Sequence, residues 1–198
     1  MTLNDRTLRI YSEIAKSYRE KTLMLDASSH REWLTTKIPP GGAILDAGCG
    51  WGRDAKAFQE EGFVVAAFDG CAAMAQQASQ HLGQPVPTLR FQEMAFMPSS
   101  FDGVWARASL LHLEPDEMAG ALKHLIGALK PRGWLYACFK EGSQTYVDAA
   151  GRYFTNMTES AFRAILAQSG HGVLREVLVT EDQFGRENRW LNVLVSRE

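Results

Sequence analysis

Three alternating glycines behind an acidic residue are the first chemically informative feature of the sequence. An apolar segment ends in Asp46, and Gly48, Gly50 and Gly52 follow at every second position. Glycines let the backbone approach a ligand closely and adopt torsions that side chains disfavour. A strand, a glycine turn and a helix in this order build a nucleotide-type pocket at the carboxyl end of the strand. The pattern predicts such a pocket without saying which nucleotide it binds.

Three kinds of ligand compete for this loop. A phosphate-cradling ATPase loop needs a Lys-Ser/Thr pair after its last glycine, whereas Arg53 and Asp54 follow here. A dinucleotide site needs a third glycine where Arg53 stands, and the Asp46 carboxylate is an awkward neighbour for a pyrophosphate. The dinucleotide interpretation is weakened and stays open. A cationic, phosphate-free ligand is the third, because its ammonium group can pair with Asp46.

A second carboxylate narrows the choice. Asp69 follows the apolar run 63–68 and lies 19 positions after Gly50. A carboxylate at this place can accept hydrogen bonds from both hydroxyls of a ribose, which fits nicotinamide and adenosyl ligands alike. The combination of Asp46, the glycines and Asp69 favours the cationic ligand.

The elements that must position these residues alternate along the chain. Helices are expected in two pieces within 4–37 and at 53–61, 74–82, 116–129 and 158–169. Strands are expected from the break at 39–42 to Asp46 and at 63–68, 86–92, 101–106, 134–139, 173–179 and 190–195. This order predicts a doubly wound, Rossmann-like α/β fold. We expect a seven-stranded, mostly parallel sheet with an antiparallel last strand and helices on both faces. One domain, 1–198, is expected, with 1–40 as a helical cap or lid and 41–198 as the core.

Composition restricts the partners. The 198 residues carry a net charge of −2 with no block of basic residues, which argues against nucleic acid as a partner. No apolar run has the length of a signal peptide or a membrane span, so we expect no membrane partner and a cytoplasmic location. The three cysteines are far apart, which predicts neither a disulfide nor a metal site. A monomer or a homodimer is expected.

Five ordered motifs resemble those of the class I S-adenosylmethionine-dependent methyltransferases. They span roughly residues 40–196 and lie at 45–52, 68–70, 101–106, 129–135 and 190–195. Five motifs in order are far more specific than one glycine loop. Within the family, 109–113 and 139–142 are similar to a small bacterial branch that includes tellurite-resistance-type methyltransferases. The resemblance implies S-adenosylmethionine as cofactor, S-adenosylhomocysteine as product, and a small-molecule acceptor that is methylated at oxygen, nitrogen, sulfur or a metalloid.

The resemblance also implies residue roles. The glycines would contact the methionine part of the cofactor, with Asp46 near its ammonium group and Arg53 near its carboxylate. Asp69 would hold the ribose. Further cofactor contacts are implied for Gly70 and Met74 beside the adenine, Glu93 or the Met94 backbone at the adenine amino group, and Arg107 between cofactor and substrate. The segment at Glu93 departs from the family pattern, which usually has an aspartate followed by a small residue.

Methyl transfer needs no dedicated catalytic side chain, because orientation alone can supply roughly 7–11 kcal/mol. His112, just past the fourth expected strand, is the best candidate for a general base, although a role in bracing its loop is favoured. Tyr11 and Tyr18 are candidates for covering the substrate, against simple packing. Two other functions stay open: a nicotinamide-dependent oxidoreductase, and a regulatory protein that binds S-adenosylmethionine without catalysis.

Overall fold

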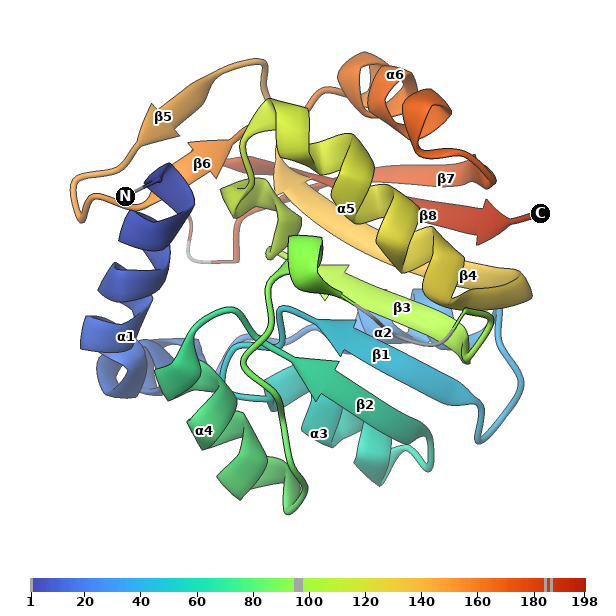
Figure 1. Ribbon diagram of the computed structural model, residues 1–198, viewed down its shortest axis with the longest axis horizontal. Coiled ribbons are helices and arrows are strands. Elements are labelled where there is room, and N and C mark those ends of the chain that lie inside the picture. The colour runs from blue at the N-terminus through green and yellow to red at the C-terminus, as the bar shows by residue number, and fades with distance from the viewer. Residues whose placement is uncertain (1, 95–97, 184, 186) are drawn as a thin grey trace.

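The computed structural model describes residues 2–94, 98–183, 185 and 187–198. Its main sheet has six strands in the order β2-β1-β3-β4-β8-β7 (Figure 1). The strands are β1 (Ala43–Ala47), β2 (Val64–Phe68), β3 (Phe101–Arg107), β4 (Leu129–Lys140), β7 (Gly172–Glu181) and β8 (Arg189–Arg197). β1 to β4 pair in parallel, and β8 lies antiparallel between β4 and β7. The Rossmann-like class and the antiparallel hairpin at one edge are confirmed.

Helices cover both faces of the sheet. They are α1 (Leu3–Thr22), α2 (Ser28–Thr35), α3 (Arg53–Glu60), α4 (Ala72–Leu82), α5 (Pro115–Ala128) and α6 (Glu159–Ser169). α5 and α6 lie in front of the sheet in Figure 1, whereas α2 and α3 lie behind it. Alternate residues of the strands face the two layers: Leu45 packs with the α5 side and Ile44 with the α2–α3 side. The carboxyl ends of the parallel strands are left for the site.

The seventh strand, predicted at 86–92, is wrong as an element of the sheet. In its place a single parallel bridge joins Thr88 to Asp69. Only two ladder hydrogen bonds form, from Asp69 N–H to the Pro87 carbonyl and from Leu89 N–H to the Asp69 carbonyl. Pro85 and Pro87 have no N–H to donate, and the chain then turns into a 3₁₀ helix, Phe91–Glu93. These constraints stop the ladder after one bridge.

A small second sheet lies in the stretch 140–157, for which the sequence predicts neither a helix nor a strand. β5 (Thr145–Val147) and β6 (Tyr153–Thr155) pair antiparallel. Tyr146 of β5 stacks on Phe154 of β6, with ring centroids 5.3 Å apart. The polar, glycine-containing sequence hides this hairpin, because its pairing rests on aromatic contacts rather than on an alternating pattern.

The N-terminal helix lies across the carboxyl ends of the strands. α1 is beside α4 at one side of the molecule, and its first turns approach β6 (Figure 1). Asp5 pairs with Arg90 at 2.6 Å, and the Thr7 hydroxyl accepts the Tyr153 N–H at 2.9 Å. The first part of the region expected to form a cap is therefore fixed to the core by polar contacts. Among the described residues, no helix has the length and apolar character needed to cross a bilayer.

Candidate functional site

A cavity of about 580 Å³ lies between α1 and the carboxyl ends of β1 to β4. Of the residues singled out from the sequence, eleven line it: Tyr11, Tyr18, Asp46, Gly48, Gly50, Arg53, Asp69, Gly70, Met74, Arg107 and His112. The described cavity lining does not include Gly52, Glu93 or Met94. The fold therefore brings most of the predicted residues together at one place.

The glycine loop has the backbone conformation that its sequence suggests. Gly48, Gly50 and Gly52 all have positive φ angles, of 77°, 58° and 87°. A Cβ on Gly48 would lie 2.5 Å from the Ser109 Cβ, whereas a Cβ on Gly50 would meet nothing within 4 Å. Gly50 is thus the glycine that leaves backbone open toward a ligand. Gly52 instead lets α3 pack on α4, because its Cβ would lie 3.2 Å from the Ala78 Cα.

Asp69 joins the ends of two loops at the cavity wall. Its carboxylate accepts the Gly50 N–H at 2.7 Å and the Cys71 N–H at 2.8 Å. Burial raises the pKa of Asp69 to about 6, although these two N–H groups act in the opposite direction. The side chain therefore both fixes the glycine loop and carries a titratable acceptor into the cavity.

Asp46 is a buried carboxylate with an unused acceptor. It is 3% exposed, and its Oδ2 atom has no hydrogen-bond partner in the described structure. Burial, followed by the nearby Asp54 carboxylate, raises the pKa of Asp46 well above its usual range. A buried polar atom without a partner is costly, so this oxygen is suited to a ligand donor or cation.

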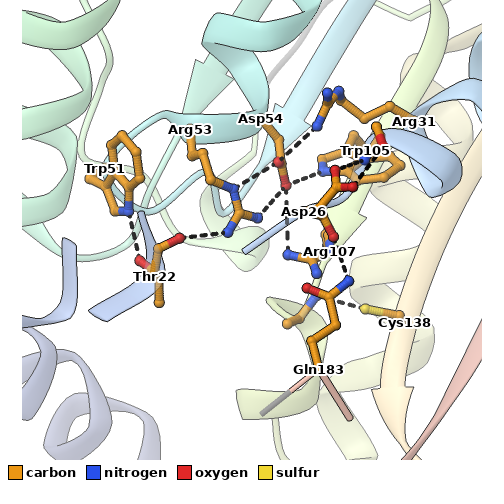
Figure 2. A network of polar contacts seen from close by, with 12 residues as sticks. Thr22, Asp26, Arg31, Trp51, Arg53, Asp54, Trp105, Arg107, Cys138 and Gln183 are labelled. Carbon is orange, nitrogen blue, oxygen red and sulfur yellow. Dashed lines mark hydrogen bonds and ion pairs between the residues drawn. The ribbon is translucent and has the colours of Figure 1, made fainter. Parts of the chain in front are cut away.

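A second buried carboxylate, Asp54, organises the cations of this part of the cavity (Figure 2). It receives the Arg53 guanidinium through two hydrogen bonds of 3.0 and 2.9 Å and the Trp105 indole N–H at 3.1 Å. Arg31 and Arg107 lie 3.6 and 3.9 Å away. Burial raises the pKa of Asp54, but Arg53 and the other donors outweigh it and hold the pKa below its ordinary value.

Sequence reasoning missed Asp54. A signal was present, because Asp54 shares the buried face of the short helix α3 with Ala55 and Phe58. An acidic residue on an apolar helix face needs partners inside the protein. Reading that face would have marked Asp54 as a residue of the site.

Tyr11, His112 and Arg152 meet at the other end of the cavity. The Tyr11 hydroxyl lies 2.9 Å from His112 Nε2, and His112 Nδ1 lies 2.7 Å from the Tyr153 carbonyl oxygen. A carbonyl only accepts, so Nδ1 carries the imidazole proton and Nε2 accepts the Tyr11 O–H. Arg152 approaches the Tyr11 oxygen at 3.4 Å and pairs with Asp148 at 2.6 Å. Burial lowers the pKa of His112 to about 4, so the ring is neutral at pH 7.

Trp51 and Arg53 anchor the end of α1 over the glycine loop. The Tyr18 ring packs edge-on against Tyr11 at 5.3 Å. The buried Trp51 indole donates to the Thr22 hydroxyl at 2.9 Å, and Arg19 lies 5.1 Å from its ring centroid. Arg53 also donates to the Thr22 carbonyl, at 3.2 Å. The C-terminal turn of α1 is therefore bound to the loop that begins α3, as Figure 2 shows.

The residues proposed for the adenine amino group lie elsewhere. Glu93 is exposed, and its carboxylate accepts the Arg90 N–H at 3.1 Å. Met94 is 8% exposed and packs in the core beneath α5. Phe91, on the same 3₁₀ turn, does line the cavity and packs against Phe68. An aromatic side chain, rather than the carboxylate of Glu93, is what this turn presents to a ligand.

Methyltransferases are among the known proteins of similar sequence and structure. Residues 44–133 match the family model of a methyltransferase domain. A Bacillus subtilis (strain 168) protein with a provisional methyltransferase name, YqeM, is 28% identical over 132 residues, which cover 64% of this chain and 53% of YqeM. The chain thus spans about half the length of this relative.

Two solved structures share the fold. The Burkholderia thailandensis 1,6-didemethyltoxoflavin-N1-methyltransferase, with its substrate and S-adenosylhomocysteine bound, has a TM-score of 0.77 at 20% identity and covers 96% of this chain and 87% of its own. The Synechocystis magnesium protoporphyrin IX methyltransferase with bound S-adenosylmethionine has a TM-score of 0.68 at 21% identity. The match covers 98% of this chain and 90% of the Synechocystis chain.

The domain match, the order of the motifs and the fold agree. Residues 44–133 match a methyltransferase domain, and the described part of the chain has the fold of solved methyltransferases. These similarities favour the cationic-ligand interpretation of the glycine loop over the dinucleotide one. The resemblance to the tellurite-resistance-type branch stays a prediction.

Proposed function

We propose that the protein transfers a methyl group from S-adenosylmethionine to a small-molecule acceptor, at oxygen, nitrogen, sulfur or a metalloid. The observation that carries this proposal is the unpartnered Oδ2 atom of buried Asp46, beside Gly50 and Asp69. The pocket favours a cation and disfavours a phosphate, because its loop residues present carboxylates. The toxoflavin-type substrate of the structurally similar Burkholderia enzyme supports a small-molecule acceptor.

The residues at the glycine loop fit the cofactor. Asp46 would take its ammonium group and Asp69 its ribose hydroxyls, with Gly70, Met74 and Phe91 lining the adenine side. A guanidinium has five N–H donors, and Arg53 uses three in its hydrogen bonds to Asp54 and Thr22. The two that remain can donate to the cofactor carboxylate. The cofactor supplies an electrophilic methyl group on a positively charged sulfur.

The protein's contribution to methyl transfer is to position the acceptor and exclude water. α1 covers the cavity through Tyr11, Tyr18 and the bound Thr22 turn. The Tyr11 hydroxyl donates its hydrogen to His112. The Tyr11 oxygen can therefore only accept hydrogen bonds from the methyl acceptor. With a pKa near 4, His112 is a poor general base at neutral pH, which favours the bracing role over the catalytic one.

A thermal-shift titration tests the cofactor assignment. S-adenosylhomocysteine should raise the melting temperature by mass action, since at 100 times Kd it adds about 2.7 kcal/mol to the free energy of unfolding. NAD should leave the temperature unchanged. Stabilisation by NAD alone would contradict the proposal. A screen with methyl-labelled cofactor against phenols, thiols, amines and metalloid oxyanions then separates an enzyme from a binding protein that transfers nothing.

A further inference from the structure

Among the described residues, a lysine at the end of β4 has no carboxylate partner although it lines the cavity. Lys140 is half-buried and is the last residue of β4, paired in register with Trp190 of β8. Four cavity arginines each lie within ion-pair distance of a carboxylate: Arg53 and Arg107 with Asp54, Arg90 with Asp5, and Arg152 with Asp148. Lys140 forms no such pair within the described part of the chain. Its charge is therefore available to a ligand.

Aromatic rings hold the Lys140 ammonium in place. Nζ lies 4.0 Å from the ring centroid of Phe154 and 5.2 Å from that of Tyr146, and it donates to the Tyr146 hydroxyl. An ammonium has three donors, so two stay unused after this bond. Cation–π contacts fix the position of the charge and leave it only partly compensated.

The neighbourhood of this ammonium is positive. Phe154 also lies 5.4 Å from the Arg152 guanidinium carbon and 4.8 Å from the centroid of the His112 ring. Arg152 and Lys140 both lower the pKa of His112, and Asp148, the ion-pair partner of Arg152, acts in the opposite direction. Two cations therefore lie at the Phe154 ring, whereas the carboxylate with an unpartnered oxygen in the described structure, Asp46, lies at the glycine loop.

We propose that Lys140 and the Phe154 side of the cavity bind an anionic oxygen group of the methyl acceptor, a carboxylate or another oxyanion. This inference rests on the proposed function and narrows it to one chemical class of acceptor. The two ends of the cavity then match two reactants of opposite charge. The Tyr11 hydroxyl, held by His112, lies beside Lys140 and Phe154. Its oxygen accepts a hydrogen bond from the substrate that is to be methylated.

Binding of matched probes to the protein saturated with S-adenosylhomocysteine tests the proposal. Benzoate, phenylphosphonate and neutral benzamide are titrated by calorimetry into the wild type, Lys140→Met, Lys140→Arg and Lys123→Met. Lys123 is an exposed lysine of α5 outside the cavity lining, and its substitution is the matched loss of one charge. The wild type should bind at least one anion roughly tenfold or more tightly than benzamide.

Lys140→Met should abolish that preference, whereas Lys140→Arg and Lys123→Met should keep it. Unchanged S-adenosylhomocysteine affinity in Lys140→Met shows that the variant is folded and that the cofactor site is separate. An anion preference that survives Lys140→Met, or a wild type that binds neither anion better than benzamide, would overturn the inference. A wild type that does not bind S-adenosylhomocysteine would instead contradict the proposed function.

Discussion

The two ends of the cavity differ in charge, in origin and in response to protons. The glycine-loop end, defined by Asp46, Asp54 and Asp69, carries three carboxylates, of which the first two are buried and Asp54 also holds arginines. The β4 end, defined by Tyr11, His112, Lys140, Arg152 and Phe154, carries cations on aromatic rings. Within the described part of the chain, this cavity of about 580 Å³ therefore has a carboxylate oxygen without a hydrogen-bond partner, on Asp46, at one end and a lysine without a carboxylate partner, Lys140, at the other. Under the proposed function, charge as well as shape then selects the two reactants.

The largest expected effect comes from removing the carboxylate that organises the glycine-loop end. Asp54→Ala leaves Arg53 and Arg107 without their partner and Trp105 without its acceptor. Breaking a buried pair by removing one partner costs about 3–5 kcal/mol. Urea unfolding of Asp54→Ala should show a loss of this size, with Asp116→Ala, an exposed residue of α5, as the control. A loss below 1 kcal/mol would mean that the network in Figure 2 contributes little to stability.

The next effect compares cofactor binding at the two ends. Asp69→Ala removes the acceptor of two backbone N–H groups and the proposed ribose ligand, so S-adenosylhomocysteine should bind roughly 10- to 100-fold more weakly. His112→Ala acts at the β4 end and should change the same dissociation constant less than threefold. Calorimetry on both variants decides the matter. Equal losses would show that the ribose contact has been misplaced.

The two ends should also respond to pH in opposite directions. The pKa of Asp69 is raised from 3.8 to about 6, so its stabilising contribution is full below pH 3.8 and is lost as pH rises through 6. The pKa of His112 is lowered from 6.5 to about 4, so its contribution is full above pH 6.5 and is lost as pH falls through 4.

Urea unfolding between pH 4 and 7 measures these contributions. The wild type should lose stability relative to Asp69→Asn as pH rises, and relative to His112→Gln as pH falls. Differences that run the same way for both variants would contradict the assigned shifts. Because the ionised carboxylate is the better acceptor, S-adenosylhomocysteine should also bind more tightly as pH rises through 6, and Asp69→Asn should flatten that dependence.

The smallest expected effect tests the adenine side. Glu93 is exposed and caps its own 3₁₀ turn through the Arg90 N–H. Glu93→Gln should therefore change the S-adenosylhomocysteine dissociation constant less than twofold, whereas Phe91→Ala, at a cavity-lining aromatic, should weaken binding several-fold. A large loss in Glu93→Gln alone would restore the role that the family resemblance implies for this residue.

Much of the glycine-loop end could be predicted because it is local in the chain. Asp46, the three glycines and Arg53 lie on one strand–turn–helix unit, and Asp69 ends the neighbouring strand, β2. Apolar runs identify such strands, and positive φ angles require the glycines. The prediction of a strand at 86–92 is wrong for an equally local reason. Two prolines lack the N–H groups that a ladder needs. Asp54 was predictable on the same local ground, because it is an acidic residue on the apolar face of α3 with Ala55 and Phe58.

The sequence by itself determined the Rossmann-like order of strands and helices, the cofactor loop and the acidic residues beside it. Only the tertiary structure decided the β4 end. The Tyr11–His112 hydrogen bond joins residues 101 positions apart, and Arg152 reaches Tyr11 across 141. No periodicity links such residues, because their contacts exist only once α1 lies over the sheet and the β5–β6 hairpin folds beside it. The direction of the Tyr11 hydrogen follows from that packing alone, and so does the lack of a carboxylate partner for Lys140 among the described residues.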